Sequence, residues 1–471
     1  MVFSVLFQEL RSLCKLLKIP INEDQLQAEQ SESPFLLLDL PGDEEARLLV
    51  QRSVLMKSCY ECLVHAREMT HLREHIQRLP ADLIATYSTS GSSFRLRIHA
   101  YGRKLSSQDV RNRIELLKVF PLDSRVDLQN PTHSFHLLED YGLEDLAEPA
   151  LQPAQLFFGR WLADSNKDAA HKLRLDERYF IGTTSMDPLL ALVMANQALV
   201  SPGSLVYDPF VGTGSLIIAA AYFGGYTFGA DIDKILLHGR GRSTRAKKTW
   251  RKSDESVLAN FRQYGLEKQY VDVLVADATS RFLRDDVQFD AIIADPPYGV
   301  REPIARVGKE KFNPSCDDTQ AVSSGMPAGA DFQLGRCVLN DLIITLVSFA
   351  AKHLRTGGRL VYWLPVLQDE YNDSAVPRHA CFDVISNSEQ CLSGSTSRRL
   401  ITMEKVKDWD PNYQVTFAKE IYTETFRERY FTSTKDKDRP KHLRFKNKIS
   451  RKVRPTEPKE LQPVTGLPAR Q

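Results

Sequence analysis

The stretch 206–215 of the sequence reads VYDPFVGTGS, and it decides the fold. A short apolar strand runs into an acid, a turn with two glycines follows, and a helix is predicted to begin at about Leu216. Glycines in such a turn let the backbone come close to a ligand, because they carry no Cβ. The order of strand, glycine loop and helix predicts a sheet whose ligand lies at the carboxyl ends of its strands.

The same rhythm continues along the chain from this stretch. Leu205–Tyr207 is the first predicted strand, and further strands are predicted at 226–230, 271–275, 290–294 and 359–364, with helical segments between them. Strands that alternate with helices form a parallel sheet with crossover connections. The sequence therefore predicts an α/β fold with a doubly wound sheet.

Two kinds of ligand compete for the glycine loop. A dinucleotide site needs a third glycine, as in G-x-G-x-x-G, but Ile217 stands at that position. Asp208, four residues before Gly212, would also repel a phosphate. An acid there suits a ligand with a positive charge, such as the ammonium or sulfonium of S-adenosylmethionine. We therefore predict that Asp208, Phe210, Gly212 and Gly214 bind this cofactor.

Further acids follow the next two predicted strands. Asp231 lies 17 residues beyond Gly214, a distance at which an acid can accept hydrogen bonds from ribose hydroxyls. Asp233 is the second candidate for this role, and the alternative for an acid at a strand end is the N-cap of a helix. Asp277 closes the third strand, where the adenine amino group of the cofactor would be recognised.

The most specific motif is DPPYG at 295–299, directly after the strand 290–294. Two prolines fix φ and remove N–H donors, so the Pro296 and Pro297 carbonyls and the Asp295 carboxylate form a rigid set of acceptors. The exocyclic amine of a nucleobase offers matching donors, and holding both N–H bonds frees its lone pair for methyl transfer. Asp295 can also take the proton that becomes acidic after transfer, and Tyr298 offers a ring on which the target base can stack. These residues are the predicted catalytic set.

The sequence of residues 1–160 predicts a smaller α+β unit. Strands are expected at 35–40 and 94–100, and helices at 43–57 and 106–117. Nothing in this region has the pattern of a catalytic cluster.

Two groups of cations are candidates for RNA contact. Arg95 and Arg97 alternate with apolar residues along the strand 94–100, and Arg240–Lys252 contains seven Lys or Arg, no acid and one tryptophan. Each group can be an ordinary solvent-exposed surface or a site that contacts RNA phosphates, and the sequence favours neither interpretation.

The composition is that of a globular protein of two or three domains, with 471 residues, 42% of them hydrophobic and 26% charged. The net charge of +2 hides an uneven distribution, because residues 435–471 contain 12 basic and 4 acidic side chains. The rest of the chain is therefore mildly acidic. Near-neutrality does not exclude RNA, but it indicates that affinity comes from placed cationic patches and from the basic tail, which is predicted to be disordered.

The cysteines and the apolar segments indicate in which cellular compartment the protein lies. Seven cysteines are scattered along the chain, which indicates reduced thiols, and no apolar stretch reaches the ~20 residues of a membrane span. We therefore expect a cytosolic or nuclear compartment, with the cytoplasm as the predicted location, and no membrane segment. Cys59, Cys62 and His65 have the spacing of metal ligands, but zinc normally takes four ligands and no second C-x-x-C follows. No metal site is predicted.

The ordered motifs resemble those of a known family. DPFxGTG, DID, ADA and DPPYG follow one another as in Rossmann-like amino-methyltransferases that use S-adenosylmethionine. Longer strings make the chain, over about residues 35–430, similar to the eukaryotic tRNA (guanine-10-N2)-methyltransferase family. They are FGRW at 158–161, IGTTSMDP at 181–188, MANQ at 194–197, NFRQYGLEK at 260–268 and TSRRLITMEK at 396–405.

This resemblance implies a domain organisation and partners. It places a ferredoxin-like region at 1–75, a THUMP domain that binds RNA at 76–165 and a Rossmann-like methyltransferase domain at 166–430. A variable insertion falls at about 309–335, and the disordered basic tail covers 435–471. The resemblance also implies tRNA as the substrate and a small zinc-binding activator subunit, shared by several methyltransferases, as a partner.

The expected reaction is methylation of the exocyclic N2 of a guanosine in tRNA, at position 10 by resemblance. Methylation of adenine N6 in RNA or DNA is an alternative, because DPPY also occurs in enzymes with that activity. A non-catalytic tRNA-binding protein with a decayed methyltransferase fold is a third reading, which the complete series of acids disfavours.

Overall fold

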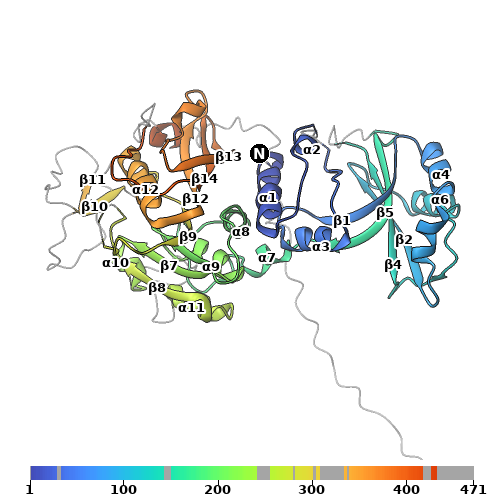
Figure 1. The fold of residues 1–471 in the computed structure, drawn as a ribbon, viewed down its shortest axis with the longest axis horizontal. Coiled ribbons are helices and arrows are strands. Elements are labelled where there is room, and N and C mark those ends of the chain that lie inside the picture. The colour runs from blue at the N-terminus through green and yellow to red at the C-terminus, as the bar shows by residue number, and fades with distance from the viewer. Residues whose placement is uncertain are drawn as a thin grey trace, which may run out of the picture.

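The computed structural model describes residues 2–28, 33–142, 150–240, 255–278, 280, 282–300, 304–307, 334–336, 339–416 and 426–431. They form an N-terminal body and a C-terminal body, each built on one large sheet, and helix α1 (Val2–Leu17) lies between the two (Figure 1). No helix among the described residues is both long enough and apolar enough to cross a membrane.

The C-terminal body contains the predicted parallel sheet. All five predicted strands are confirmed: β6 (Leu205–Asp208), β7 (Tyr226–Asp231), β8 (Tyr270–Val275), β9 (Phe289–Ala294) and β12 (Leu354–Leu367). The sheet order is β13-β14-β12-β9-β6-β7-β8, so β6 lies between β7 and β9. The chain builds outward from β6 first to one side and then to the other, which creates a topological switch point at the carboxyl end of β6.

Two antiparallel strands complete this sheet and were not predicted from the sequence. β14 (Thr396–Lys405) pairs antiparallel with β12, and β13 (Phe382–Ser393) pairs antiparallel with β14 at the edge. The motif TSRRLITMEK therefore lies on a strand inside the sheet. A small separate pair of strands is formed by β10 (Ala305–Val307) and β11 (Leu334–Arg336).

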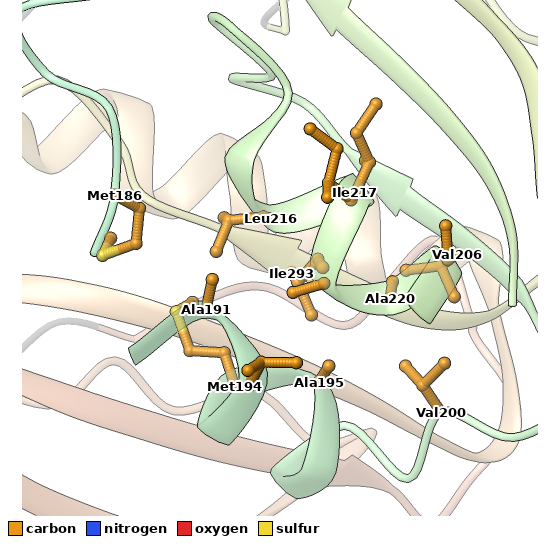
Figure 2. Packing of buried hydrophobic residues seen from close by; sticks show 14 of the residues in the cluster. Met186, Ala191, Met194, Ala195, Val200, Val206, Leu216, Ile217, Ala220 and Ile293 are labelled. Carbon is orange, nitrogen blue, oxygen red and sulfur yellow. The ribbon is translucent and has the colours of Figure 1, made fainter. Parts of the chain in front are cut away.

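Helices cover both faces of the sheet, and alternate residues of β9 face opposite layers. Ile293 packs in one cluster with α8 (Pro188–Gln197) and α9 (Ser215–Tyr222), as Figure 2 shows. Ile292 packs in a second cluster with α12 (Leu339–His353) on the other face. A strand buried on both faces explains the nearly continuous apolar run that precedes the DPPY motif. Shorter helices flank the sheet: α7 (Asp168–Lys172), α10 (Lys234–Leu237), α11 (Val257–Gln263) and the 3₁₀ turns at Glu267–Gln269 and Asp373–Ala375.

The N-terminal body is a five-stranded sheet in the order β1-β5-β4-β2-β3. Its strands are β1 (Ser58–Ala66), β2 (Ser93–Tyr101), β3 (Arg125–Val126), β4 (His133–Asp140) and β5 (Gln155–Asp164). Its helices are α2 (Glu23–Ala28), α3 (Asp43–Arg52), α4 (Met69–Gln77), α5 (Ala81–Tyr87) and α6 (Ser107–Leu117). β1 belongs to the same sheet as β2–β5, and the domain boundaries given above stay predictions.

The predictions for this body were partly right. β2 and α6 are confirmed, and α6 begins where Ser106 and Asp109 form a capping box. The predicted helix 43–57 is too long, since α3 ends at Arg52. The predicted strand at 35–40 is wrong, because this segment has no strand structure. Its leucines pack against the cluster built on α1 and α3, so the apolar pattern arose from packing on helices.

Buried polar contacts join α1 to the elements around it. Glu9 of α1 is fully buried and accepts hydrogen bonds from Ser53 Oγ at 2.6 Å and from Asn196 Nδ2 of α8 at 2.7 Å. Arg359 of β12 donates from Nη1 to Ser12 Oγ at 3.0 Å. Buried polar groups with partners on three elements fix the position of α1 on the C-terminal body.

Three predicted features lie outside the described residues. They are the basic cluster beyond Arg240, most of the insertion at 309–335 and the basic tail at 435–471.

Candidate active site

The sheet brings the predicted acids to one edge. β6, β7, β8 and β9 run parallel, so the residues after their carboxyl ends lie along the same side of the sheet. Asp208 ends β6, Asp231 ends β7, Asp277 follows β8 and Asp295 follows β9. The switch point next to β6 is the place where open α/β sheets bind ligands.

The two glycines of the loop differ in their surroundings: the backbone is accessible at Gly212 and closely packed at Gly214. Gly212 has φ +48°, and a Cβ placed there would have the Phe210 carbonyl oxygen, 4.0 Å away, as its nearest neighbour. Gly214 has φ +85°, and a Cβ there would lie 2.8 Å from Val257 Cγ1. A side chain at Gly212 would therefore fill open space beside the loop, whereas Gly214 packs the loop onto α11.

This arrangement fits S-adenosylmethionine. Open backbone at Gly212 can approach an adenosyl or methionyl group, and the acids at the neighbouring strand ends suit hydroxyls, amines and positive charge. The residues predicted from the sequence to hold the cofactor are Asp208, Phe210, Gly212, Gly214, Asp231 and Asp277, and this set stays a prediction.

Asp208 is the most deeply buried acid of this set. Its side chain is 1% exposed, and Oδ1 accepts a hydrogen bond from the Phe210 N–H at 2.9 Å. Burial raises the pKa of its carboxyl well above the ordinary value, and the negative charges of Asp231 and Asp295 raise it further. The Phe210 hydrogen bond opposes this shift only in part. A buried acid near two others is a strong site for a ligand that brings positive charge.

The acids after β7 divide into two roles. Asp231 Oδ2 accepts from the Gly212 N–H at 2.8 Å and Oδ1 accepts from the Asp233 N–H at 2.9 Å, so this residue ties the glycine loop to β7. Asp233 caps α10 by accepting from the Leu236 N–H at 2.9 Å. The helix-cap alternative is thus what the structure has for Asp233. Asp277 is 5% exposed after β8.

The DPPY motif forms a hydrogen-bonded cluster with a residue from a distant strand. The Tyr298 hydroxyl donates to Asp295 Oδ1 and accepts from Arg398 Nη1 at 3.1 Å. The same Nη1 lies 3.6 Å from Asp295 Oδ2. Burial raises the pKa of Tyr298 well above its ordinary range and the Asp295 carboxylate raises it further, so the hydroxyl keeps its proton as a donor.

Tyr298 also makes a contact that the sequence did not predict. Its ring is partly buried and meets Phe426 edge to face at 6.4 Å between centroids. Its hydroxyl orients the carboxylate of Asp295, a contact that the stacking prediction did not include. Pro296 is buried and Pro297 is partly buried beside it.

Other residues support the loop and carry no role in the prediction from sequence. Ser185 Oγ lies 2.7 Å from Thr213 Oγ1 of the glycine loop and accepts from the Gly182 N–H at 2.8 Å. Asn260 of α11 donates to the Thr213 carbonyl at 3.3 Å. Ser185 and Asn260 lie within the strings IGTTSMDP and NFRQYGLEK, so these strings marked positions whose contacts only the fold defines.

The Cys59, Cys62 and His65 triplet lies along β1, and the ring of His65 stacks on Phe157 at 4.7 Å. In the part of the chain that the structure describes, no three His, Cys, Asp or Glu side chains are placed to hold a metal ion.

Comparisons with known proteins identify the family of this chain. Residues 4–167 match the family model of the Tmrp11 THUMP N-terminal domain, and residues 176–319 match that of the RMKL-like methyltransferase domain. The chain is 41% identical over 434 residues to the tRNA (guanine(10)-N(2))-methyltransferase TRMT11 of Xenopus laevis, covering 91% of this chain and 88% of that protein. It is 33% identical to the protein of the same name from Dictyostelium discoideum over 425 residues, which is 85% of this chain and 80% of that one.

A solved structure, TrmN from Thermus thermophilus, aligns with 75% of this chain and 84% of its own at 18% identity and a TM-score of 0.33. The family assignment rests on the sequence relatives and on the two family models. The chain belongs to the tRNA (guanine(10)-N(2))-methyltransferase family.

Proposed function

We propose that this protein transfers a methyl group from S-adenosylmethionine to the exocyclic N2 of guanosine 10 in tRNA. The observation that carries the proposal is the position of the DPPY motif in a member of this family. Asp295 follows β9 directly beside β6, so the acceptors for the target amine stand next to the glycine loop that would hold the cofactor.

Each residue of the site has a part in this reaction. S-adenosylmethionine, when bound, supplies a methyl group on a positively charged sulfur. Asp208, Asp231 and Asp277 hold the cofactor against the loop at Gly212. The Asp295 carboxylate and the Pro296 carbonyl accept the two N–H bonds of the target amine, which frees its lone pair to attack.

Charge balance at the amine gives Asp295 a second task. As the new N–C bond forms and the methyl–sulfur bond breaks, the sulfur becomes neutral and the nitrogen gains a positive charge. Its proton is then acidic, and the Asp295 carboxylate can accept it. The ring of Tyr298 provides a surface for the flat target base, while its hydroxyl holds the Asp295 carboxylate.

The experiment that tests this function is methylation of an unmodified tRNA transcript followed by mass-spectrometric mapping of its nucleosides. We expect N2-methylguanosine at position 10 as the product. Methyladenosine would instead support the adenine alternative, and failure to bind the cofactor in calorimetry would support the non-catalytic one. The family assignment favours guanosine N2 over both.

A cationic cavity in the N-terminal body supports contact with tRNA. A cavity of about 300 Å³ opens between β2, β4, β5 and α3, and it is lined by Arg47, Arg95, Arg160 and Trp161 among others. Arg160 is held by Asp43 at 2.5 Å and by Glu61 at 2.6 Å, whereas Arg95 donates to Ser134 Oγ at 2.9 Å. Arginine beside a partly exposed indole suits a phosphate and a stacked base. We therefore favour RNA contact over a merely solvated face for Arg95.

We also propose that the small zinc-binding activator subunit binds the edge strand β8. Within the described residues, β8 pairs only with β7, so its outer edge is open. Val271 is 51% exposed, Leu274 is 39% exposed and Val275 is 45% exposed. Because neighbouring strand residues point to opposite faces, Leu274 and Val275 expose apolar surface on both faces at the carboxyl end of this strand. An apolar edge of this kind is where a second chain can add a strand.

Lysine in place of Leu274 is expected to weaken this complex by about tenfold or more, because charge on an edge strand opposes strand addition. Affinity for the purified activator subunit, measured by calorimetry, checks the prediction. Leu151→Lys is the matched control, since Leu151 is 83% exposed in the N-terminal body and should leave the affinity unchanged. Equal affinities for both variants would show that the subunit docks elsewhere.

We further propose a cytoplasmic location. The cysteines among the described residues are all free, in keeping with a reducing compartment.

A further inference from the structure

Arg398 reaches the candidate active site from a strand that lies far away in the sequence. It stands on β14, in register with Pro365 of β12 and Gln390 of β13. Its side chain is 12% exposed and points to the DPPY motif, where Nη1 donates to the Tyr298 hydroxyl at 3.1 Å and lies 3.6 Å from Asp295 Oδ2. A permanently charged group is thus placed beside the predicted catalytic acid.

The guanidinium is held from every side. Nε donates to Gln390 Oε1 at 2.8 Å, Nη2 lies 3.8 Å from Met186 Sδ, and the Trp363 ring stacks under Cζ at 4.0 Å. Burying a charge costs free energy unless hydrogen bonds and an opposite charge compensate it. Here the only acid that the structure places within ion-pair distance of Arg398 is Asp295, among the described residues. The charge of this arginine is therefore compensated by Asp295, and its hydrogen bond to Tyr298 helps to hold it there.

We propose that Arg398 is a positioning residue for methyl transfer: it holds the Asp295 carboxylate and the Tyr298 hydroxyl in the geometry that receives the target amine. This inference rests on the function proposed above and adds a residue to it. The Tyr298 hydroxyl accepts from Arg398 and donates to Asp295, so the arginine fixes the direction in which the phenol points its proton. Without Arg398, the hydroxyl and the carboxylate can both turn away.

The neighbouring arginine provides a natural contrast. Arg399 points to the other face of β14, where Nε donates to Asn387 Oδ1 at 2.8 Å and the guanidinium lies 4.2 Å from the Tyr371 ring centroid. It pairs with Glu389 at 3.4 Å. Arg399 is as well anchored as Arg398, but it touches neither Asp295 nor Tyr298 in the described contacts.

The test compares Arg398→Met with Arg399→Met in the full chain, with the activator subunit present. The readouts are the kcat and KM for tRNA, taken from transfer of a labelled methyl group, and the Kd for S-adenosylmethionine. For Arg398→Met we expect kcat to fall about 100-fold while KM and Kd change by less than about threefold, because misplacing a reacting group affects the chemical step. Arg399→Met should retain the kcat of the unaltered protein.

Two further measurements separate positioning from a loss of folding. Guanidinium ions, added to Arg398→Ala below the concentration that unfolds it, should restore part of kcat, because they can refill the space beside Asp295. Tyr298→Phe combined with Arg398→Met should be no slower than Arg398→Met alone, because both changes remove one hydrogen-bonded unit.

A kcat for Arg398→Met close to that of the unaltered protein would overturn the inference. So would a loss that guanidinium does not restore and that multiplies with the effect of Tyr298→Phe. Nucleoside mapping of the same reactions tests the proposed function separately. A methylated nucleoside other than N2-methylguanosine would refute that function. The effect of Arg398→Met on the rate could still be measured in that case.

Discussion

Replacing Asp295 with alanine is expected to slow methyl transfer to tRNA about a thousandfold, the size of effect that follows loss of a group that handles a proton. The substitution removes the acceptor for the target amine and the group placed to take its proton. It also leaves the Arg398 guanidinium without the acid that it approaches at 3.6 Å. Single-turnover transfer of a labelled methyl group to an unmodified transcript is the measurement, because it reports the chemical step.

Cofactor affinity provides the control for this variant. Asp295 follows β9, whereas the glycine loop follows β6, so Asp295→Ala should bind S-adenosylmethionine with nearly unchanged Kd. Asp383→Ala, an exposed acid on the edge strand β13, is the matched substitution that should leave the rate unchanged. A folded Asp295→Ala protein that binds cofactor and methylates at the native rate would rule out the catalytic role.

Asp208→Asn is expected to change cofactor binding and stability in opposite directions. Asparagine keeps an oxygen to accept the Phe210 N–H, which lies 2.9 Å from Oδ1, but it removes the negative charge. Affinity for S-adenosylmethionine should fall about 10- to 100-fold, equivalent to losing one hydrogen bond or contact with a charged group, worth about 1.5–3 kcal/mol. The free energy of unfolding without cofactor should rise, since ionising a buried acid is costly.

The pH dependence of this variant follows from the direction of the shift. The pKa of Asp208 is raised in the folded chain, so the folded state keeps its proton to higher pH than the unfolded state does. The free energy of unfolding therefore falls as pH rises from the ordinary value of 3.8 through the folded-state pKa. Thermal unfolding of the cofactor-free protein across this range should show a larger gain for Asp208→Asn at the upper end.

The opposite pattern would contradict this view of Asp208. If the variant bound cofactor normally, the acid would serve the fold alone. If it were less stable than the unaltered protein at every pH, the carboxylate would be a net stabilising group, and burial would not be the dominant influence on it.

The parallel part of the fold could be predicted because each of its strands is marked by residues that are neighbours in the sequence. Each runs as a short apolar segment into glycine, proline or aspartate, and such punctuation is visible in the sequence. The acids at the strand ends could be predicted for the same reason. Asp208, Asp231, Asp277 and Asp295 each follow a strand, and parallel pairing places them at one edge.

The rest depends on contacts between distant segments. The leucines of 35–40 look like a strand, but Leu36, Leu38 and Leu40 are partly buried against a cluster that contains residues of α1 and α3. An apolar pattern does not show what the segment packs against. β13 and β14 form an antiparallel hairpin around Gly394, which has φ +50°, and this hairpin lies outside the alternation of strand and helix from which the other strands were predicted. Arg398 was inside a recognised string, yet its contact with Tyr298 arises from the register of β14 against β12 and could not be read from spacing.

The central claim is that the exocyclic amine of guanosine 10 is the methyl acceptor, and a single atomic change in the substrate tests it. A tRNA with inosine at position 10 lacks this amine and keeps the rest of the base. With the activator subunit and labelled S-adenosylmethionine, we expect methyl transfer to the guanosine-containing tRNA and none to the inosine-containing tRNA. Equal transfer to both would contradict the account, because the group held by Asp295 and Pro296 would not be the one that is methylated.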